Sequence, residues 1–195
     1  MLGGTFDPIH LGHLAVAKAA MECADVDRVL FIPSAQPPHR AAARAPAEDR
    51  LAMSKLAVDG DPHYEVSDIE VKRGGASYTV DTLDELHRSF PDDELFLILG
   101  WDAARFFRTW HEPEGVSALA SFVIVGRPGM RPPTPADLKA AGLDLARVVL
   151  CLLPTPDISG SELRRAIAAG ESVAGKVPSA VERYIAGHHL YGDNR

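Results

Sequence analysis

The chain has 195 residues, a length that suits one globular domain with a sizeable core. Its formal net charge of −7 argues against broad nucleic-acid binding, because such binding needs a basic face. The hydrophobic content of 46% is ordinary for a water-soluble fold, and no apolar run approaches the ~18 residues of a membrane span. We therefore expect one domain over residues 1–195, with no membrane or nucleic-acid partner. Because no signal peptide is evident, we also expect a cytoplasmic location.

The stretch from Gly3 to His13 reads GGTFDPIHLGH. Asp7 and Pro8 fit a helix start, with aspartate as the cap and proline at the first helical position. The two histidines, His10 and His13, are three residues apart and would share one face of the first helical turn. Backbone N–H groups there favour an anion, and a glycine between the histidines leaves room for a ring or sugar. A glycine turn that merely happens to carry two histidines is the alternative interpretation.

Helix and strand patterns alternate through the first half of the chain. We expect helices over 11–24 and 48–58, strands over 28–32 and 64–72, and a loop over 34–46. The few residues before the glycines predict an unusually short first strand, unless the native start lies upstream of Met1. Strand, helix and strand in this length form a βαβ unit with parallel strands. Ligands of such sheets bind at the carboxyl ends of the strands.

The second half continues the alternation and adds a second helix-start motif. We expect a helix over 79–90, strands over 94–100, 121–125 and 147–153, and a final helix over 178–191. Ser159 and Glu162 have the spacing of a capping box. Both cysteines, Cys23 and Cys151, lie in apolar runs without metal-ligand spacing, so we expect buried reduced thiols. The predicted fold class is α/β, a Rossmann-like doubly wound parallel sheet with helices on both faces.

The opening stretch resembles the GGTFDPIHxGH signature of bacterial nicotinate-nucleotide adenylyltransferases. Its HxGH core is shared by a wider nucleotidyltransferase superfamily. Further segments are similar to that family in the same order: PPHR at 37–40, RGGASYTVDTL at 73–83, GWD at 100–102, TWH at 109–111 and ISGSELR at 158–164. The last segment departs from the family pattern, because Gly160 replaces a serine and Ser161 a threonine.

The resemblance implies two groups of binding residues. The expected catalytic residues are His10, His13 and Arg164. The expected ATP-binding residues are Gly3, Gly4, Thr5, Phe6, His10, Gly12, His13, Gly100, Asp102, Ile158, Ser159, Ser161 and Arg164. Those expected to bind the second substrate are His39, Arg40, Tyr78, Thr79, Trp110 and His111. In the family, the tryptophan stacks on a pyridine ring whose carboxylate meets backbone N–H groups near Thr79 and His111.

The implied reaction joins ATP and nicotinate mononucleotide to give deamido-NAD and pyrophosphate. Mg²⁺ would be bound through the ATP phosphates, and no metal site on the protein is predicted. The segment from about 158 to 195 would be a helical portion of the same domain. Three alternatives stay open: a sister enzyme such as pantetheine-phosphate adenylyltransferase, a non-catalytic nucleotide sensor, and a structural domain without a ligand. A homo-oligomer is possible, and the preference for the acid over the amide mononucleotide is open.

Overall fold

The computed structural model describes residues 1–37 and 42–192. Its strands form two three-stranded parallel sheets that lie edge to edge. One sheet contains β1 (Leu2–Gly4), β2 (Val29–Pro33) and β3 (Tyr64–Val66), and the other β4 (Phe96–Gly100), β5 (Ser121–Val125) and β6 (Val148–Cys151). The Ile98 N–H donates to the Met1 carbonyl at 2.9 Å, so the chain just before β1 meets β4. The spatial order is therefore β3-β2-β1-β4-β5-β6, which confirms the doubly wound fold.

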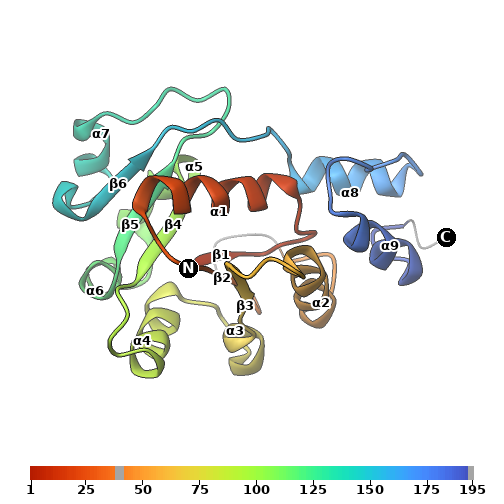
Figure 1. Ribbon diagram of the computed structural model, residues 1–195, viewed down its shortest axis with the longest axis horizontal. Coiled ribbons are helices and arrows are strands. Elements are labelled where there is room, and N and C mark those ends of the chain that lie inside the picture. The colour runs from red at the N-terminus through yellow and green to blue at the C-terminus, as the bar shows by residue number, and fades with distance from the viewer. Residues whose placement is uncertain (38–41, 193–195) are drawn as a thin grey trace.

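Helices connect the strands and cover both faces of the sheets (Figure 1). They are α1 (Leu11–Ala24), α2 (Ala47–Val58), α3 (Ile69–Arg73), α4 (Thr79–Ser89), α5 (Trp101–Ala104), α6 (Pro113–Leu119), α7 (Pro135–Ala140), α8 (Gly160–Ala168) and α9 (Ser179–Gly187). Short 3₁₀ turns lie at Phe107–Thr109 and Leu145–Arg147. The helix predicted over 11–24 is confirmed at both ends.

Alternate residues of the central strands pack into two separate cores. Ile98 and Val123 share one core with Ala17 of α1. Their neighbours Leu97 and Phe122 point the other way, into a core with residues of α4 and α6. Successive side chains of a strand point to opposite faces, so the continuous apolar runs of β4 and β5 serve both layers. Figure 1 shows α1 on one side of these strands and α4 and α6 on the other.

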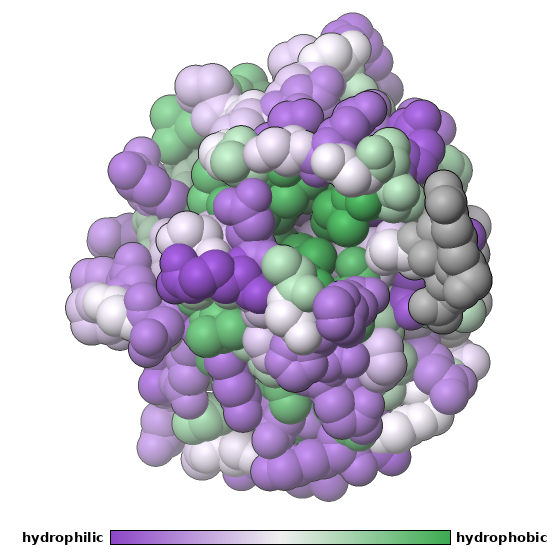
Figure 2. All heavy atoms as spheres, turned by 90° about the vertical axis from the view of Figure 1, so that its right-hand side faces the viewer, coloured by the Kyte–Doolittle hydropathy of each residue, from purple (hydrophilic) through white to green (hydrophobic). Residues whose placement is uncertain are grey.

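The C-terminal helices lie to one side of the sheets, next to α2 (Figure 1). The Tyr184 hydroxyl of α9 donates to a carboxylate oxygen of Asp49 in α2 at 2.8 Å. Figure 2 views the molecule from this end, where polar side chains cover most of the face and apolar residues show near its centre. After α9 the chain turns back, and the Tyr191 hydroxyl donates to the carboxylate of Asp7, in the turn that follows β1, at 2.8 Å.

The strand predicted over 64–72 is wrong in its second half. Only Tyr64–Val66 pairs with β2, and the chain then forms the short helix α3. The Ser67 hydroxyl accepts the Ile69 N–H at 3.3 Å, and Asp68 pairs with Lys72 one turn later. These local polar contacts favour a helical turn over continuation of the ladder.

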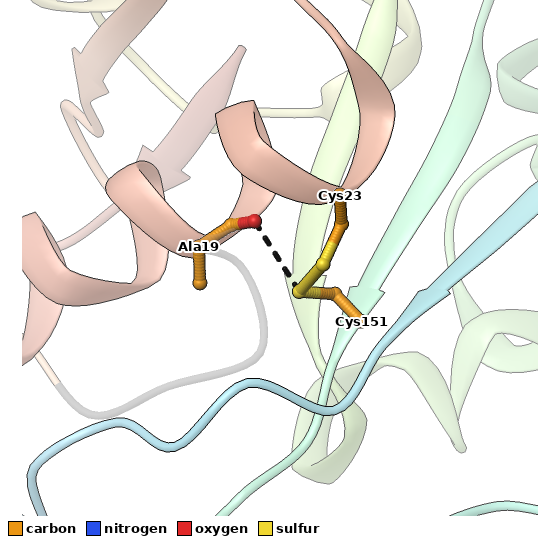
Figure 3. Close-up of a disulfide and its surroundings, with 3 residues drawn as sticks. All are labelled: Ala19, Cys23 and Cys151. Carbon is orange, nitrogen blue, oxygen red and sulfur yellow. Dashed lines mark hydrogen bonds between the residues drawn. A yellow bond between two sulfur atoms is a disulfide. The ribbon is translucent and has the colours of Figure 1, made fainter.

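The expectation of two reduced thiols is also wrong. Cys23 near the end of α1 and Cys151 at the end of β6 form a disulfide, with Cα atoms 5.7 Å apart (Figure 3). The Cys151 sulfur lies 3.3 Å from the Ala19 carbonyl oxygen. The two residues are separated by 128 positions, so only the packing of α1 on β6 brings them within bonding range.

Among the helices described, none is both long and apolar enough to cross a membrane.

Candidate active site

The turn between β1 and α1 departs from the predicted helix start. Asp7 and Pro8 are joined by a cis peptide bond, and the helix begins at Leu11 with His10 as its N-cap. Asp7 is buried, and its carboxylate accepts backbone N–H groups from Arg44 at 2.8 Å and Ala45 at 3.1 Å. A buried carboxylate needs such donors. Asp7 therefore binds a distant loop instead of capping its own helix.

His10 and His13 lie together as their spacing predicts. The two rings stack with centroids 3.7 Å apart, and the His10 backbone N–H donates to Nδ1 of His13 at 3.2 Å. Nδ1 of His13 is thus an acceptor, so a neutral His13 ring carries its proton on Nε2. The Phe6 ring packs edge-on against His13 with centroids 4.9 Å apart. A Cβ on Gly12 would lie 2.9 Å from Nδ1 of His10, so the room that this glycine leaves is occupied by His10 itself.

Burial keeps His10 neutral in the absence of an anion. Its side chain is 5% exposed, and Nδ1 has no hydrogen-bond partner among the described residues. Burial, together with the positive charge of Arg127, lowers the pKa of His10 to about 4. A phosphate arriving beside this ring would favour its charged form, because an opposite charge nearby raises the pKa of a histidine.

The ISGSELR segment meets the histidine turn, as the sequence predicts. Arg164 in α8 donates from Nη1 to the Asp7 carbonyl at 2.6 Å, and the same atom lies 3.6 Å from the Asp7 carboxylate. Ile158 lies against Gly12, where a Cβ would be 3.5 Å from the isoleucine Cβ. These contacts join residues more than 140 positions apart at one end of α1.

The start of α8 differs in detail from its prediction. Ser159 is the N-cap by backbone conformation, but its hydroxyl bonds to that of Ser161 at 2.8 Å and the capping box is not formed. A Cβ on Gly160 would lie 3.4 Å from the Asp7 carbonyl oxygen. A side chain at this position would therefore begin in ordinary van der Waals contact with the turn.

A cavity of about 500 Å³ opens beside this turn, at the carboxyl ends of β1 and β4. Its walls include eight of the predicted site residues: Gly3, Gly4, Thr5, Tyr78, Thr79, Asp102, Trp110 and His111. Gly100 precedes Asp102 at the end of β4. The remaining predicted residues that the structure describes lie in the histidine turn and at the start of α8. His39 and Arg40 lie outside the described residues.

Aromatic rings and a helix start shape the cavity. The rings of Tyr78 and His111 pack with centroids 4.2 Å apart, and Trp110 packs on Phe107 at 5.6 Å. Tyr78 is the N-cap of α4, so the first N–H groups of this helix, beginning at Thr79, have no partner within the helix. Unpaired N–H groups beside flat rings suit an aromatic acid.

Two charged residues of the site were not predicted from the sequence. Glu70 is 5% exposed and lines the cavity, and its carboxylate accepts the Thr82 hydroxyl at 2.7 Å. Burial raises the pKa of Glu70, and its hydrogen bonds offset part of this rise. No sequence signal pointed to Glu70, because it lies within the segment predicted as a strand. Arg127 follows β5, and its position in the GRPG turn at a strand end was the signal available.

The carboxylates of the site offer little to a metal on their own. Asp102 lies 3.6 Å from the Arg127 guanidinium. In residues 1–37 and 42–192, no group of three His, Cys, Asp or Glu side chains could hold an ion. A divalent ion held mainly by substrate phosphates and water fits this donor set, and a metal cage made by the protein does not.

Comparison with known proteins places the chain in a family. The cytidylyltransferase-like family model matches residues 1–166. A probable nicotinate-nucleotide adenylyltransferase of Thermus thermophilus is 49% identical over 98% of this chain and 97% of its own length. A probable enzyme of the same name from Thermomicrobium roseum is 41% identical over 98% of this chain and 90% of its own length.

A solved structure agrees on the fold. Plasmodium falciparum nicotinic acid mononucleotide adenylyltransferase, complexed with NaAD, superposes with a TM-score of 0.80 at 19% identity, covering 97% of this chain and 95% of that one. The motifs, their meeting at one end of the sheets and the similarity over nearly the full length agree. The chain therefore belongs to the nicotinate-nucleotide adenylyltransferase family, within the cytidylyltransferase-like proteins.

Proposed function

We propose that this chain transfers the adenylyl group of ATP to nicotinate mononucleotide, giving deamido-NAD and pyrophosphate. The observation that carries the proposal is the contact of Arg164 with the Asp7 carbonyl at 2.6 Å. This contact joins the ISGSELR helix to the HxGH turn beside a cavity lined by Tyr78, Trp110 and His111. A triphosphate site and a pocket for an aromatic acid then adjoin each other. The names of relatives that are 41% to 49% identical support the same reaction.

In the proposed reaction, a phosphate oxygen of the mononucleotide attacks the α-phosphorus of ATP in line. A new P–O bond forms as the bond from the α-phosphorus to the bridging oxygen breaks, and pyrophosphate leaves with that electron pair. No covalent enzyme intermediate is needed. The chain would contribute positioning and stabilisation of the charge that develops on the phosphates.

His10, His13 and Arg164 would supply that stabilisation. Because Nδ1 of His13 is an acceptor, the ring proton lies on Nε2, and this N–H would donate to a phosphate oxygen. The guanidinium of Arg164 has five N–H donors, so it can hold the Asp7 carbonyl and also donate to phosphate oxygens. Gly3 to Phe6, Gly12, Gly100, Asp102, Ile158, Ser159 and Ser161 would complete the ATP site.

Mg²⁺ bound through the ATP phosphates would neutralise charge on the triphosphate and on the departing pyrophosphate. Asp102 is the predicted site residue that could hold the ion, directly or through water. Its neighbour Arg127 lies within 3.6 Å, so this carboxylate already has a cationic partner. If Asp102 held the ion, the guanidinium of Arg127 would stay beside it at the edge of the site, in a position to face a phosphate.

The acceptor pocket supports a preference for the acid mononucleotide. N–H groups at the start of α4 and near His111 would meet the pyridine carboxylate, and Trp110 would stack on the ring. An amide would turn its own N–H groups toward those donors. His39 and Arg40 are proposed to bind the mononucleotide by family resemblance alone.

A steady-state assay with ATP tests the proposal. Initial rates of pyrophosphate release should give a kcat/KM for nicotinate mononucleotide about tenfold or more above that for the amide. The same assay with phosphopantetheine separates the sister activity, which predicts that this acceptor reacts faster. ATP binding in calorimetry without pyrophosphate release from any acceptor would favour a nucleotide sensor and contradict the proposal.

A further inference from the structure

Arg50 of α2 is a charged side chain enclosed by the protein beside the proposed triphosphate site. It is 1% exposed, and it is the largest of the fully buried side chains among the described residues. A buried charge is costly unless hydrogen bonds compensate for it. Burial lowers the pKa of Arg50, and the nearby Asp7 carboxylate offsets part of this effect. A guanidinium nonetheless stays charged in proteins, so its surroundings must account for it.

The guanidinium of Arg50 donates to three backbone carbonyls from three different nitrogens. Nη1 bonds to Thr5 at 2.7 Å, Nη2 to Ala35 at 3.0 Å and Nε to Ala45 at 3.2 Å. Thr5 lies in the turn that follows β1, two residues before Asp7. Ala35 and Ala45 lie near the two ends of the loop that connects β2 to α2. One planar group thus joins the histidine turn to both ends of this loop.

Each of these loop ends is also held by a second side chain of the site. Arg50 binds the Ala45 carbonyl, and the N–H of the same alanine donates to the Asp7 carboxylate at 3.1 Å. The Ala35 N–H donates to the Ser77 hydroxyl at 2.9 Å, next to Tyr78 in the cavity wall. Arg50 therefore connects three parts of the proposed site: the histidine turn, the loop after β2 and the start of α4.

We infer that Arg50 is a positioning residue for adenylyl transfer, one that sets the placement of the acceptor side of the site relative to the ATP side. The inference rests on the proposed function. Arg50 lies beneath the site and does not line the cavity. Its effect would pass through the carbonyls that it holds. A displacement on the order of 1 Å between two bound substrates can cost about 100-fold in rate.

Arginine suits this role better than lysine. The three carbonyls are met by donors fixed in one plane, whereas a lysine ammonium presents its donors from a single nitrogen. Arg50→Lys keeps the positive charge beside Asp7 but removes the planar set of N–H donors that meets the three carbonyls. The substitution therefore tests geometry with little change in charge.

The experiment compares wild type, Arg50→Lys and the control Arg88→Lys in the pyrophosphate-release assay, at a temperature well below each thermal midpoint. Arg88 is exposed and pairs with Asp84 on the surface of α4. We expect Arg50→Lys to lower kcat by about 10- to 100-fold. The Kd for ATP in calorimetry should stay within about threefold of wild type, because no ATP contact is removed. Arg88→Lys should match wild type in both measurements.

A purely structural role predicts a lower thermal midpoint with unchanged kcat and KM, and that result would overturn the inference. A loss confined to the KM for ATP would overturn it as well. If Arg50→Lys does not fold, Ser77→Ala decides, because it removes the second anchor of Ala35. That variant should lower kcat about fivefold, and an unchanged kcat would refute the inference. An inactive wild-type chain would instead refute the proposed function.

Discussion

Replacing His13 by alanine tests the triphosphate site directly. Nδ1 of this ring accepts the His10 N–H, so Nε2–H is the donor that the substitution removes from the site. Removing one preorganised donor to a developing charge costs about 10²- to 10³-fold in kcat. We expect a loss of that size, because the substitution removes both this donor and the ring that stacks on His10 with centroids 3.7 Å apart.

The variant should lose some stability but stay folded. The alanine variant leaves the His10 N–H without its side-chain acceptor and removes the contacts with His10 and Phe6. Each of these three losses is worth about 1 kcal/mol, so the free energy of unfolding should fall by about 3 kcal/mol. A domain with about 5–15 kcal/mol of stability remains folded after such a change.

The assay measures pyrophosphate release at saturating ATP and nicotinate mononucleotide, with a thermal midpoint recorded for each protein. His87→Ala is the matched control, because His87 is an exposed histidine in the last turn of α4. The control should keep wild-type kcat. Near-normal turnover in folded His13→Ala would refute the role that we assign to this ring.

Three further changes follow from contacts at the site and in the core. Tyr191→Phe removes a donor to the buried Asp7 carboxylate at 2.8 Å, so the free energy of unfolding measured in urea should fall by about 1–3 kcal/mol. The comparison is Tyr184→Phe, which removes a donor to the half-buried Asp49, and an equally small change in both variants would contradict this expectation. The folded pKa of His10, about 4, lies below its unfolded value of 6.5, so the unfolded chain binds more protons between these pH values and stability falls as pH falls through this window. The loss should reach about 3 kcal/mol and be absent in His10→Gln; equal pH dependence of both proteins in urea titrations would contradict it. Reducing the Cys23–Cys151 disulfide, which closes a loop of 128 positions, should cost up to about 4–5 kcal/mol of stability. Thiol labelling of unfolded, unreduced protein should detect no cysteine, and labelling of both would show that the bond is absent.

Regular elements and local motifs could be predicted because their causes are local. The helix over Leu11–Ala24 and the strand over Ser121–Val125 have the predicted bounds, since periodicity and apolar runs identify them without any tertiary contact. The stacking of His10 on His13 follows from residues three positions apart. The family resemblance rests on the same short segments, and it led to the correct family.

Predictions failed where one residue had a choice of partners. Asp7 could cap a helix or bind a distant loop, and the tertiary structure turns it toward Arg44 and Ala45. Ser159 could cap α8, but its hydroxyl binds Ser161 instead. Glu70 was missed because its burial against Thr82 depends on how α3 meets α4. Propensity scales rank such residues but cannot choose among contacts that do not exist until the chain has folded.

The sequence by itself determined the alternation of strands and helices, the closeness of the two histidines in the HxGH turn and the family, because these depend on neighbouring residues. Only the tertiary structure decided which distant groups meet. It pairs Cys23 with Cys151, places Arg164 on the Asp7 carbonyl and encloses Arg50 among three carbonyls from different segments. The physical reason is that burial removes water as a partner for each polar group, and the fold alone determines which protein group replaces it.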